Sequence, residues 1–198
     1  MLHAGAMAAT PLRIRAVIGV LACAAALSAQ DALSQALSLE TYRQGDAVTV
    51  FADVELQVDP GIAWAVLSDY DHLSDFVPDM SVSRVVSRNG ATAIVEQKGE
   101  FGLLFFRQQI ELKLEITETP KRTIVARAIG GSFREMSGRY DLEDTGRGVR
   151  IAYTGRFVPD FSLPTFLGII AIRHTAATQL GAMVDEILRR DARAKTSR

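Results

Sequence analysis

The sequence predicts an α+β fold in which a curved antiparallel sheet grips one long helix over an apolar cavity. A strand-like run, Val48–Val58, ends at Asp59-Pro60, a pair that caps and starts a short helix. Runs of alternating apolar and polar residues follow, without the helical crossovers that parallel strands require. A long segment with apolar residues at helical spacing, 164–190, comes last and must lay its apolar side on the sheet.

The boundaries of the expected elements come from turn residues and from the period of the apolar positions. Asn89-Gly90 is a strong hairpin signal, and residues 109–116 alternate strictly between polar and apolar side chains. We predict strands at 48–58, 80–87, 91–100, 106–117, 122–129, 133–143 and 149–157, and helices at 60–68, 72–76 and 164–190. Residues 30–45 are a polar lead-in, partly helical, before one domain at 46–193 and a tail at 194–198.

Length and composition are those of one globular domain. The chain has 198 residues, of which 48% are hydrophobic and 23% are charged, which is enough to bury a sizeable core. Its formal net charge is −1, so the sequence lacks the basic excess that nucleic-acid binding needs. We therefore expect no nucleic-acid partner.

The N-terminal residues have the pattern of an export signal. Arg13 and Arg15 precede the apolar run Ala16–Leu27, which has the length of a signal core and is too short to span a bilayer. We expect residues 1–29 to be a signal peptide and the mature protein, beginning between Ala24 and Ala36, to be periplasmic. The alternatives are an uncleaved anchor and a lipoprotein signal in which Cys23 is lipidated.

Few residues offer catalytic or metal chemistry. Cys23 is the only cysteine, so cleavage of the signal leaves no thiol for a disulfide, a metal or a nucleophile. The histidines are His3, His72 and His174, and none of them forms a pair at the spacing of metal ligands on a helix. Nucleophile elbows, phosphate-binding glycine loops and dinucleotide fingerprints are also missing. We predict no catalytic residue, no metal site and no cofactor.

The final helix carries a charge within its apolar stripe. Phe166, Ile169, Ile170 and Ala177 recur at helical spacing, and Arg173 falls about 20° from Phe166 at 100° per residue. A buried guanidinium needs an acidic partner, a ligand oxygen or a route to water. We predict that Arg173 holds the polar end of a ligand and that the four apolar residues line its cavity. The alternative is an ion-paired or solvent-facing Arg173.

The facing sheet supplies the remaining ligand-binding candidates. Alternation turns Met136, Tyr140 and Phe157 toward the helix, and Phe106 ends the apolar hairpin tip Leu103–Phe106. The functional interpretation of this tip is a lid or a transient contact with a membrane. The structural alternative is a hairpin that packs on its own domain.

Short motifs recur in a fixed order along the body of the chain. They are Val58-Asp59-Pro60 with Trp64, Leu67-Ser68-Asp69-Tyr70, Phe76-Val77-Pro78, Gly131-Ser132-Phe133, Gly138-Arg139-Tyr140-Asp141-Leu142, Gly148-Val149-Arg150-Ile151, and Pro159 and Pro164 before the final helix. This set, over Val48–Arg190, resembles the START-like (SRPBCC) superfamily, and within it the polyketide cyclase/dehydrase and coenzyme-Q-binding branch. The resemblance implies a helix-grip fold, a seven-stranded antiparallel sheet around a long C-terminal helix. It also implies a cavity for lipids, isoprenoid quinones or polyketides. Tyr140 is a departure, because relatives often carry Trp there.

Two classes of function follow. One is an exported carrier or sensor that holds a hydrophobic small molecule in its cavity, which agrees with the missing catalytic constellation. The other is a cyclase or dehydratase that orients a polyketide-like substrate by the shape of its cavity. Export disfavours the enzyme, because polyketide intermediates are made on cytosolic carriers. A partner-binding module that uses the sheet or the hairpin is a third alternative.

Overall fold

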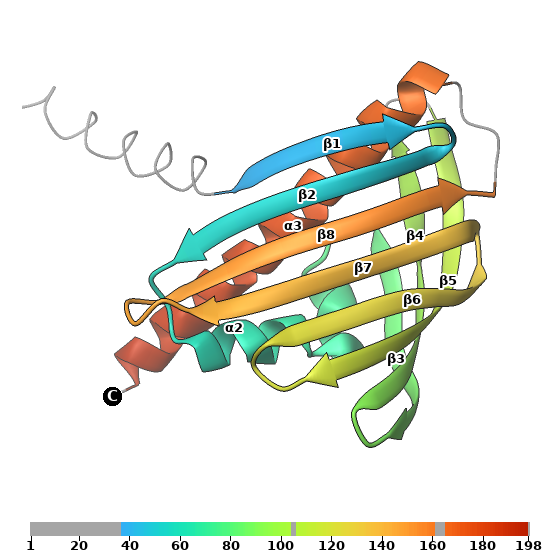
Figure 1. Cartoon of the computed structure of the whole chain (residues 1–198). Coiled ribbons are helices and arrows are strands. Elements are labelled where there is room, and N and C mark those ends of the chain that lie inside the picture. The colour runs from blue at the N-terminus through green and yellow to red at the C-terminus, as the bar shows by residue number, and fades with distance from the viewer. Residues whose placement is uncertain (1–36, 104–105, 161–164, 198) are drawn as a thin grey trace, which may run out of the picture. The chain divides into compact units, whose positions relative to one another are not determined.

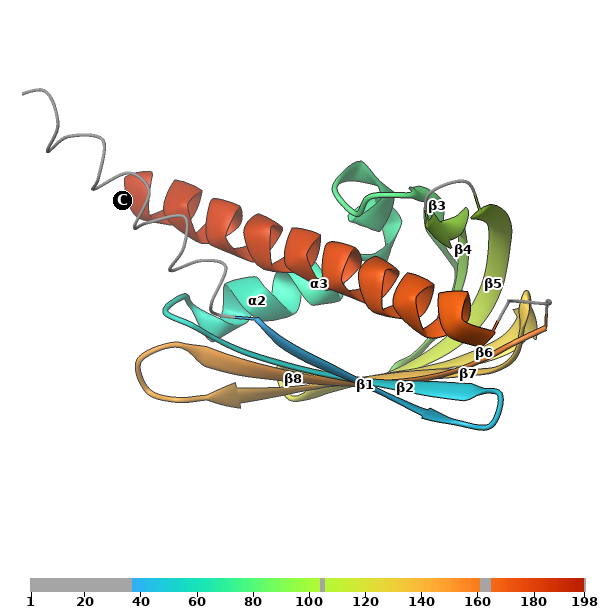
Figure 2. The same cartoon turned by 90° about the horizontal axis from the view of Figure 1, so that it is seen from above.

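The computed structural model describes residues 37–103, 106–160 and 165–197. In chain order the elements are β1 (Ser38–Gln44), β2 (Ala47–Leu56), α2 (Pro60–Leu67), the 3-10 helix η1 (Tyr70–Asp75), β3 (Met80–Asn89), β4 (Thr92–Leu103), β5 (Phe106–Thr119), β6 (Thr123–Gly131), β7 (Phe133–Asp144), β8 (Val149–Pro159) and α3 (Thr165–Thr196). The sheet forms one layer, α3 crosses its concave face, and α2 lies beside α3 on that side (Figures 1 and 2). The predicted α+β helix-grip fold is confirmed.

The sheet is antiparallel throughout the described residues, in the order β1-β2-β8-β7-β6-β5-β4-β3. β2 pairs with β8, which joins the start of the body to its end. The other strands follow as a meander, and the β3–β5 end of the sheet curls up toward α3 (Figure 2). This curl creates the concave face that holds the helix.

The sheet has one strand more than the seven we expected. β1 lies at the edge of the sheet, within the segment predicted to be a polar and partly helical lead-in. Leu39 packs against buried side chains while its neighbours Ser38 and Glu40 are exposed. The segment Ser38–Gln44 has few apolar residues, so its sequence is a weak signal for a strand. It is a strand because it pairs with β2. The predicted signal peptide, residues 1–29, lies outside the described residues.

The short helix α2 begins as its sequence predicts. The Asp59 side chain accepts a hydrogen bond of 2.7 Å from the backbone N–H of Gly61, and Pro60 occupies the first turn. The helix buries Ala63, Val66 and Leu67, and Trp64 packs half-buried against the same core cluster. This helix therefore fills one end of the space between the sheet and α3.

Ion pairs fasten the C-terminal half of α3 to the elements around it. Arg190 bonds to Asp69, just before η1, at 2.9 Å and to the buried Glu186 at 2.6 Å. The buried Asp191 accepts a hydrogen bond of 3.2 Å from the backbone N–H of Asp59. α3 extends to Thr196, beyond the predicted end at Arg190, and Lys195 pairs with Asp191 in this extension. Within the described part of the chain, no helix is long and apolar enough to cross a membrane.

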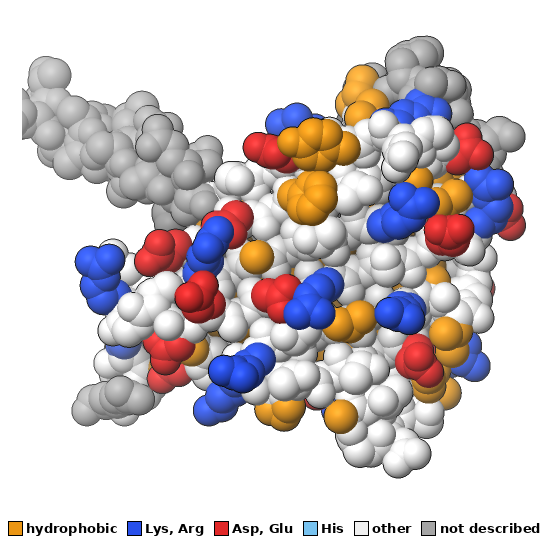
Figure 3. All heavy atoms as spheres, viewed as in Figure 1, with side chains coloured by type: hydrophobic (Ala, Val, Ile, Leu, Met, Phe, Trp, Pro, Cys, Tyr) orange, Lys and Arg blue, Asp and Glu red, His pale blue; other side chains and the backbone are white. Residues whose placement is uncertain are grey.

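The convex face of the sheet, which is turned away from α3, carries acidic and basic side chains among neutral ones and a few hydrophobic ones (Figure 3). Arg150 pairs with Asp53 across β8 and β2 at 2.9 Å, and Arg139 pairs with Asp141 at 2.6 Å. Each exposed pair contributes little to stability, because water screens its charges. These pairs lie on the solvated face, which also exposes a few apolar side chains such as Phe51 and Ile129, while most apolar residues of the strands point to the concave side.

Candidate ligand-binding cavity

The core is divided into two clusters with a cavity between them. One cluster gathers α2, η1 and the nearby strand ends around Ile187, and the other gathers Val50, Phe101 and Ile172 near the first half of α3. Residues of both clusters line one cavity of about 200 Å³ between the sheet and α3. That volume far exceeds the roughly 10–15 Å³ that one water needs, so the cavity is more than a packing defect.

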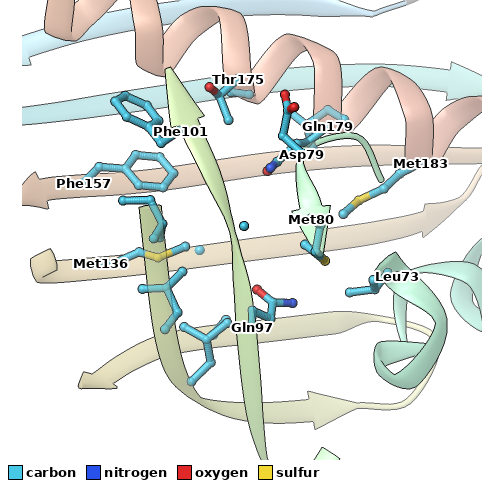
Figure 4. Close-up of a pocket in the computed structure, with 18 of the residues that line it drawn as sticks. Leu73, Asp79, Met80, Gln97, Phe101, Met136, Phe157, Thr175, Gln179 and Met183 are labelled. Atoms are coloured by element: carbon cyan, nitrogen blue, oxygen red, sulfur yellow. The ribbon is translucent and has the colours of Figure 1, made fainter. Parts of the chain in front are cut away.

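The wall of the cavity is mostly apolar. Leu114 and Ile116 come from β5, as the strict alternation of that strand predicts, and Leu73 comes from η1. In Figure 4, Phe101 and Phe157 lie on one side with Met136, and Met80 and Met183 lie on the other side. Unbranched Met side chains adapt to irregular shapes, which suits a cavity that must close around a ligand.

Polar groups gather where α3 faces the loop before β3. Thr175 and Gln179 extend from the helix, and Asp79 lies on the facing loop (Figure 4). Asp79 is exposed, has a φ of 60°, and its carbonyl accepts a hydrogen bond of 2.8 Å from the N–H of Glu100. We call Thr175, Gln179 and Asp79 the polar rim of the cavity.

The cavity face of α3 differs from our prediction. It consists of residues at helical spacing, namely Ile172, Thr175, Ala176, Gln179, Leu180 and Met183. Arg173 and Ala177 are exposed, Ile170 is 49% exposed, and the half-buried Ile169 packs against the second core cluster instead of lining the cavity. The prediction that Arg173 lies in the cavity was therefore wrong. The side chain of Phe166 lies outside the described residues.

This error has a geometric reason. The predicted apolar stripe was centred on Phe166, but the residues that face the cavity centre roughly 110° from Phe166 around the helix. The N-terminal part of α3 carries apolar side chains on more than one side, since Ile170 is exposed while Ile172 is buried. Sequence periodicity therefore left the orientation of the helix open, and packing against the sheet decided it.

Three of the sheet residues that we predicted to face the helix lie where we expected them. Met136, Tyr140 and Phe157 all line the cavity, although their contact with a ligand stays a prediction. The side chain of Phe106 lies outside the described residues, as does most of the tip at 103–106, so the membrane contact also stays a prediction. We did not single out Tyr153, although alternation places it on the same face of β8 as Phe157.

Tyr140 and Tyr153 form a cross-strand pair at the floor of the cavity. They are partners between β7 and β8, and their ring centroids are 4.7 Å apart. The Tyr153 ring lies over another cross-strand pair, Gly138 and Gly155. A Cβ atom on Gly155 would be 2.4 Å from the Tyr153 hydroxyl oxygen, so this space depends on the glycine.

The hydroxyl groups within the cavity wall are neutral donors. Burial raises the pKa of Tyr140 well above its ordinary value, and it raises the pKa of Tyr153 as well. Burial first, and then the nearby Glu118 carboxylate, raise the pKa of Tyr70. Glu118 is not in hydrogen-bonding geometry with Tyr70, whose buried hydroxyl has no partner among the described residues. All three groups keep their protons at neutral pH.

The described residues contain no group of side chains suited to bind a metal ion. Within them, no group of three or more His, Cys, Asp or Glu side chains could hold a metal ion. His72 is exposed and bonds through Nδ1 to Asp69 at 2.6 Å, and His174 is exposed on α3. Neither histidine lines the cavity.

The chain is similar to proteins of one family. The family described as polyketide cyclase / dehydrase and lipid transport matches residues 41–184. The comparison with curated protein sequences gives no match.

Solved structures with the same fold share little sequence with this chain. The Zhui aromatase/cyclase from Streptomyces sp. R1128 has a TM-score of 0.62 at 15% identity, over 73% of this chain and 95% of that one. The STAR-related lipid transfer protein from Xanthomonas axonopodis has a TM-score of 0.62 at 14% identity, over 77% and 94%. A START superfamily protein from Mycobacterium smegmatis has a TM-score of 0.58 at 12% identity, over 74% and 98%. At these identities the likeness concerns the fold.

Proposed function

Because the chain belongs to the polyketide cyclase/dehydrase and lipid transport family, we propose that it binds one hydrophobic small molecule in its cavity as an exported carrier or sensor. The expected membership of the START-like superfamily is confirmed by this match and by the helix-grip fold. The observation that carries the proposal is the cavity of about 200 Å³ between the sheet and α3. Lipid, isoprenoid quinone and polyketide remain the candidate ligand classes.

Binding as the main task agrees with the chemistry of the cavity wall. A general acid or base works best when its pKa is near the operating pH, and burial moves the tyrosine pKa values away from it. Large apolar surfaces with a few placed polar groups are typical of sites that hold a ligand. The wall and the polar rim have this composition.

Native mass spectrometry with organic extraction of the purified protein tests for a bound molecule. The control pair is Ala176→Phe and Ala177→Phe, because Ala176 lines the cavity and the adjacent Ala177 is exposed. We expect Ala176→Phe to lower the affinity for the neutral fluorescent probe N-phenyl-1-naphthylamine about tenfold, since the larger side chain would occupy cavity space that the probe needs. Ala177→Phe should retain the affinity. Equal affinity in both variants would contradict binding in this cavity.

Export rests on the N-terminal sequence. Arg13 and Arg15 before the apolar run Ala16–Leu27 have the pattern of a signal peptide. Cleavage between Ala24 and Ala36 would retain every described strand, because β1 begins at Ser38. N-terminal sequencing of the protein from the periplasm tests this step, and an intact Met1 or a lipid on Cys23 would contradict it.

The second candidate is an enzyme of the cyclase or dehydratase type. It is favoured by the tyrosine hydroxyls in the cavity wall, which could orient the carbonyl groups of a polyketide-like chain. Incubation with a linear poly-β-ketone analogue distinguishes the two candidates. A cyclase would form an isomer of equal mass through a new carbon–carbon bond, a cyclase that then dehydrates this aldol would form a product lighter by one water, and a carrier would give no more product than a sample without protein.

A further inference from the structure

The charged residues of the cavity wall do not direct their charges into the cavity. Among the described lining residues they are Asp79, Lys98 and Glu100. Strand alternation turns Lys98 and Glu100 outward, where Lys98 bonds to Glu111 at 2.7 Å and Glu100 bonds to Arg107 at 2.6 Å. Asp79 belongs to the exposed polar rim. An anionic group inside the cavity would therefore lose its water without gaining a counter-charge.

The neutral polar groups of the wall, in contrast, have unused capacity to donate hydrogen bonds. The Tyr140 hydroxyl donates a hydrogen bond to the Sδ atom of Met183 at 3.5 Å, and a thioether is a weak acceptor. Tyr153 makes no side-chain hydrogen bond to a described residue, and its hydroxyl lies over Gly155 on the cavity floor. The Tyr140 and Tyr153 side chains line the cavity, so a ligand oxygen placed beside their hydroxyl groups would accept hydrogen bonds from them.

We propose that the cavity selects an apolar ligand with a neutral oxygen, such as a ketone carbonyl, which accepts hydrogen bonds from the hydroxyl groups of Tyr153 and Tyr140. The proposal rests on the proposed function and narrows its ligand class. A fatty acid or another anionic amphiphile is disfavoured. The two strands β7 and β8 hold both donors in fixed positions, because Tyr140 and Tyr153 are direct cross-strand partners. Their raised pKa values agree with this role, since both groups stay protonated.

Three probes of the same size test this selectivity, namely 2-acetonaphthone, 2-ethylnaphthalene and 2-naphthoate, each measured by displacement of N-phenyl-1-naphthylamine at neutral pH. The ketone should bind roughly tenfold more tightly than the hydrocarbon and the carboxylate. Tyr153→Phe should remove the preference for the ketone while retaining the affinity for 2-ethylnaphthalene, because only the hydroxyl is lost. Tyr140→Phe should give a smaller loss, because the Met183 sulfur already accepts from that hydroxyl.

Tyr42→Phe is the matched control, because Tyr42 is exposed on β1 and bonds to Glu40 away from the cavity. It should leave all three affinities unchanged. Equal affinities for the three probes, tighter binding of 2-naphthoate, or an unchanged ketone preference in Tyr153→Phe would overturn the selectivity and leave the cavity function standing. If no probe bound the wild-type protein, the proposed function would fail together with the selectivity. If Tyr153→Phe did not fold, the order of the three affinities on the wild-type protein would still decide whether the cavity prefers the neutral ketone.

Discussion

At the scale of single residues, the cavity depends on where side chains are missing as much as on where they are present. Gly138 and Gly155 lie opposite each other on β7 and β8, and the ring of Tyr153 occupies the space above them. A Cβ atom on Gly155 would be 2.8 Å from a ring carbon of Phe157, closer than real Cβ contacts allow. Glycine at this position therefore lets two aromatic rings lie low on the sheet, which leaves room above them.

Gly155→Ala tests this account. The new methyl group should force Tyr153 and Phe157 upward into the cavity, with a loss of about 1–3 kcal/mol in the free energy of unfolding and weaker binding of N-phenyl-1-naphthylamine. Urea unfolding and fluorescence titration measure the two effects. Gly130→Ala on β6 is the control, because its Cβ would meet no atom within 4 Å. If Gly155→Ala and Gly130→Ala had equal stability and equal probe affinity, the two aromatic rings would adapt to the methyl group without a cost in either quantity.

At the scale of elements, the ion pairs around Asp69 join η1 to α3. Asp69 bonds to His72 at 2.6 Å and to Arg190 at 2.9 Å, and η1 contributes Tyr70 and Leu73 to the cavity wall. Burial raises the pKa of Asp69, but the hydrogen bonds with His72 and Arg190 outweigh it, so the net pKa is lowered. The hydrogen bond with Asp69 raises the pKa of His72. The carboxylate that joins this wall to α3 through Arg190 is therefore also the partner of a histidine whose pKa is raised.

The bond between His72 and Asp69 predicts that His72→Gln changes the stability of the protein in a pH-dependent way. A raised folded-state pKa means that protonated His72 stabilises the fold fully below its unfolded pKa, about 6.5, and that this contribution is lost as the pH rises through the raised value. The variant should be less stable than the wild type at about pH 5.5, and the difference should shrink toward about pH 9. Urea unfolding at both pH values measures it. His174→Gln, which removes an exposed imidazole from α3, is the matched control. A stability deficit of His72→Gln that is equal at both pH values would contradict a stabilising bond between protonated His72 and Asp69.

At the scale of the whole molecule, β1 completes the sheet on the side where the second core cluster lies. It pairs with β2 from Ser38↔Asp53 to Gln44↔Ala47, and Leu39 packs against the cluster that contains Val48 and Val50. Without β1, the edge of β2 would be open to solvent next to these buried residues. The domain therefore begins before residue 46, where the composition alone had placed its start.

A shortened chain tests the contribution of β1. A protein that begins at Asp46 should be less stable than one that begins at Ala36 by at least about 2 kcal/mol, from the lost burial of Leu39 and the lost pairing. Urea unfolding of both proteins measures this difference. Leu39→Ser should reproduce part of the loss and Glu40→Ser should not, because Leu39 packs inward and Glu40 is exposed. Equal stability of the two proteins would mean that β1 is dispensable.

The sequence by itself determined the features that depend on neighbouring residues. Alternation along β5 identified its buried face, Asp59 and Pro60 identified the start of α2, and the strand-and-turn order identified the antiparallel meander. Alternation also placed Met136, Tyr140 and Phe157 on the inner face of the sheet. These signals are local, because strand period and helix caps act over a few residues.

Only the tertiary structure decided which face of α3 meets the cavity and whether residues 38–44 are a strand. Arg173 and Ala177 are exposed while Ile172 and Ala176 face inward, although all four belong to one continuous helix. The rotation of a helix on a sheet is set by the sum of many contacts with residues distant in sequence, and periodicity leaves it open when apolar residues occur on several sides. β1 is a strand because β2 offers a partner, and the cavity is lined by residues from both core clusters, which are distant in sequence.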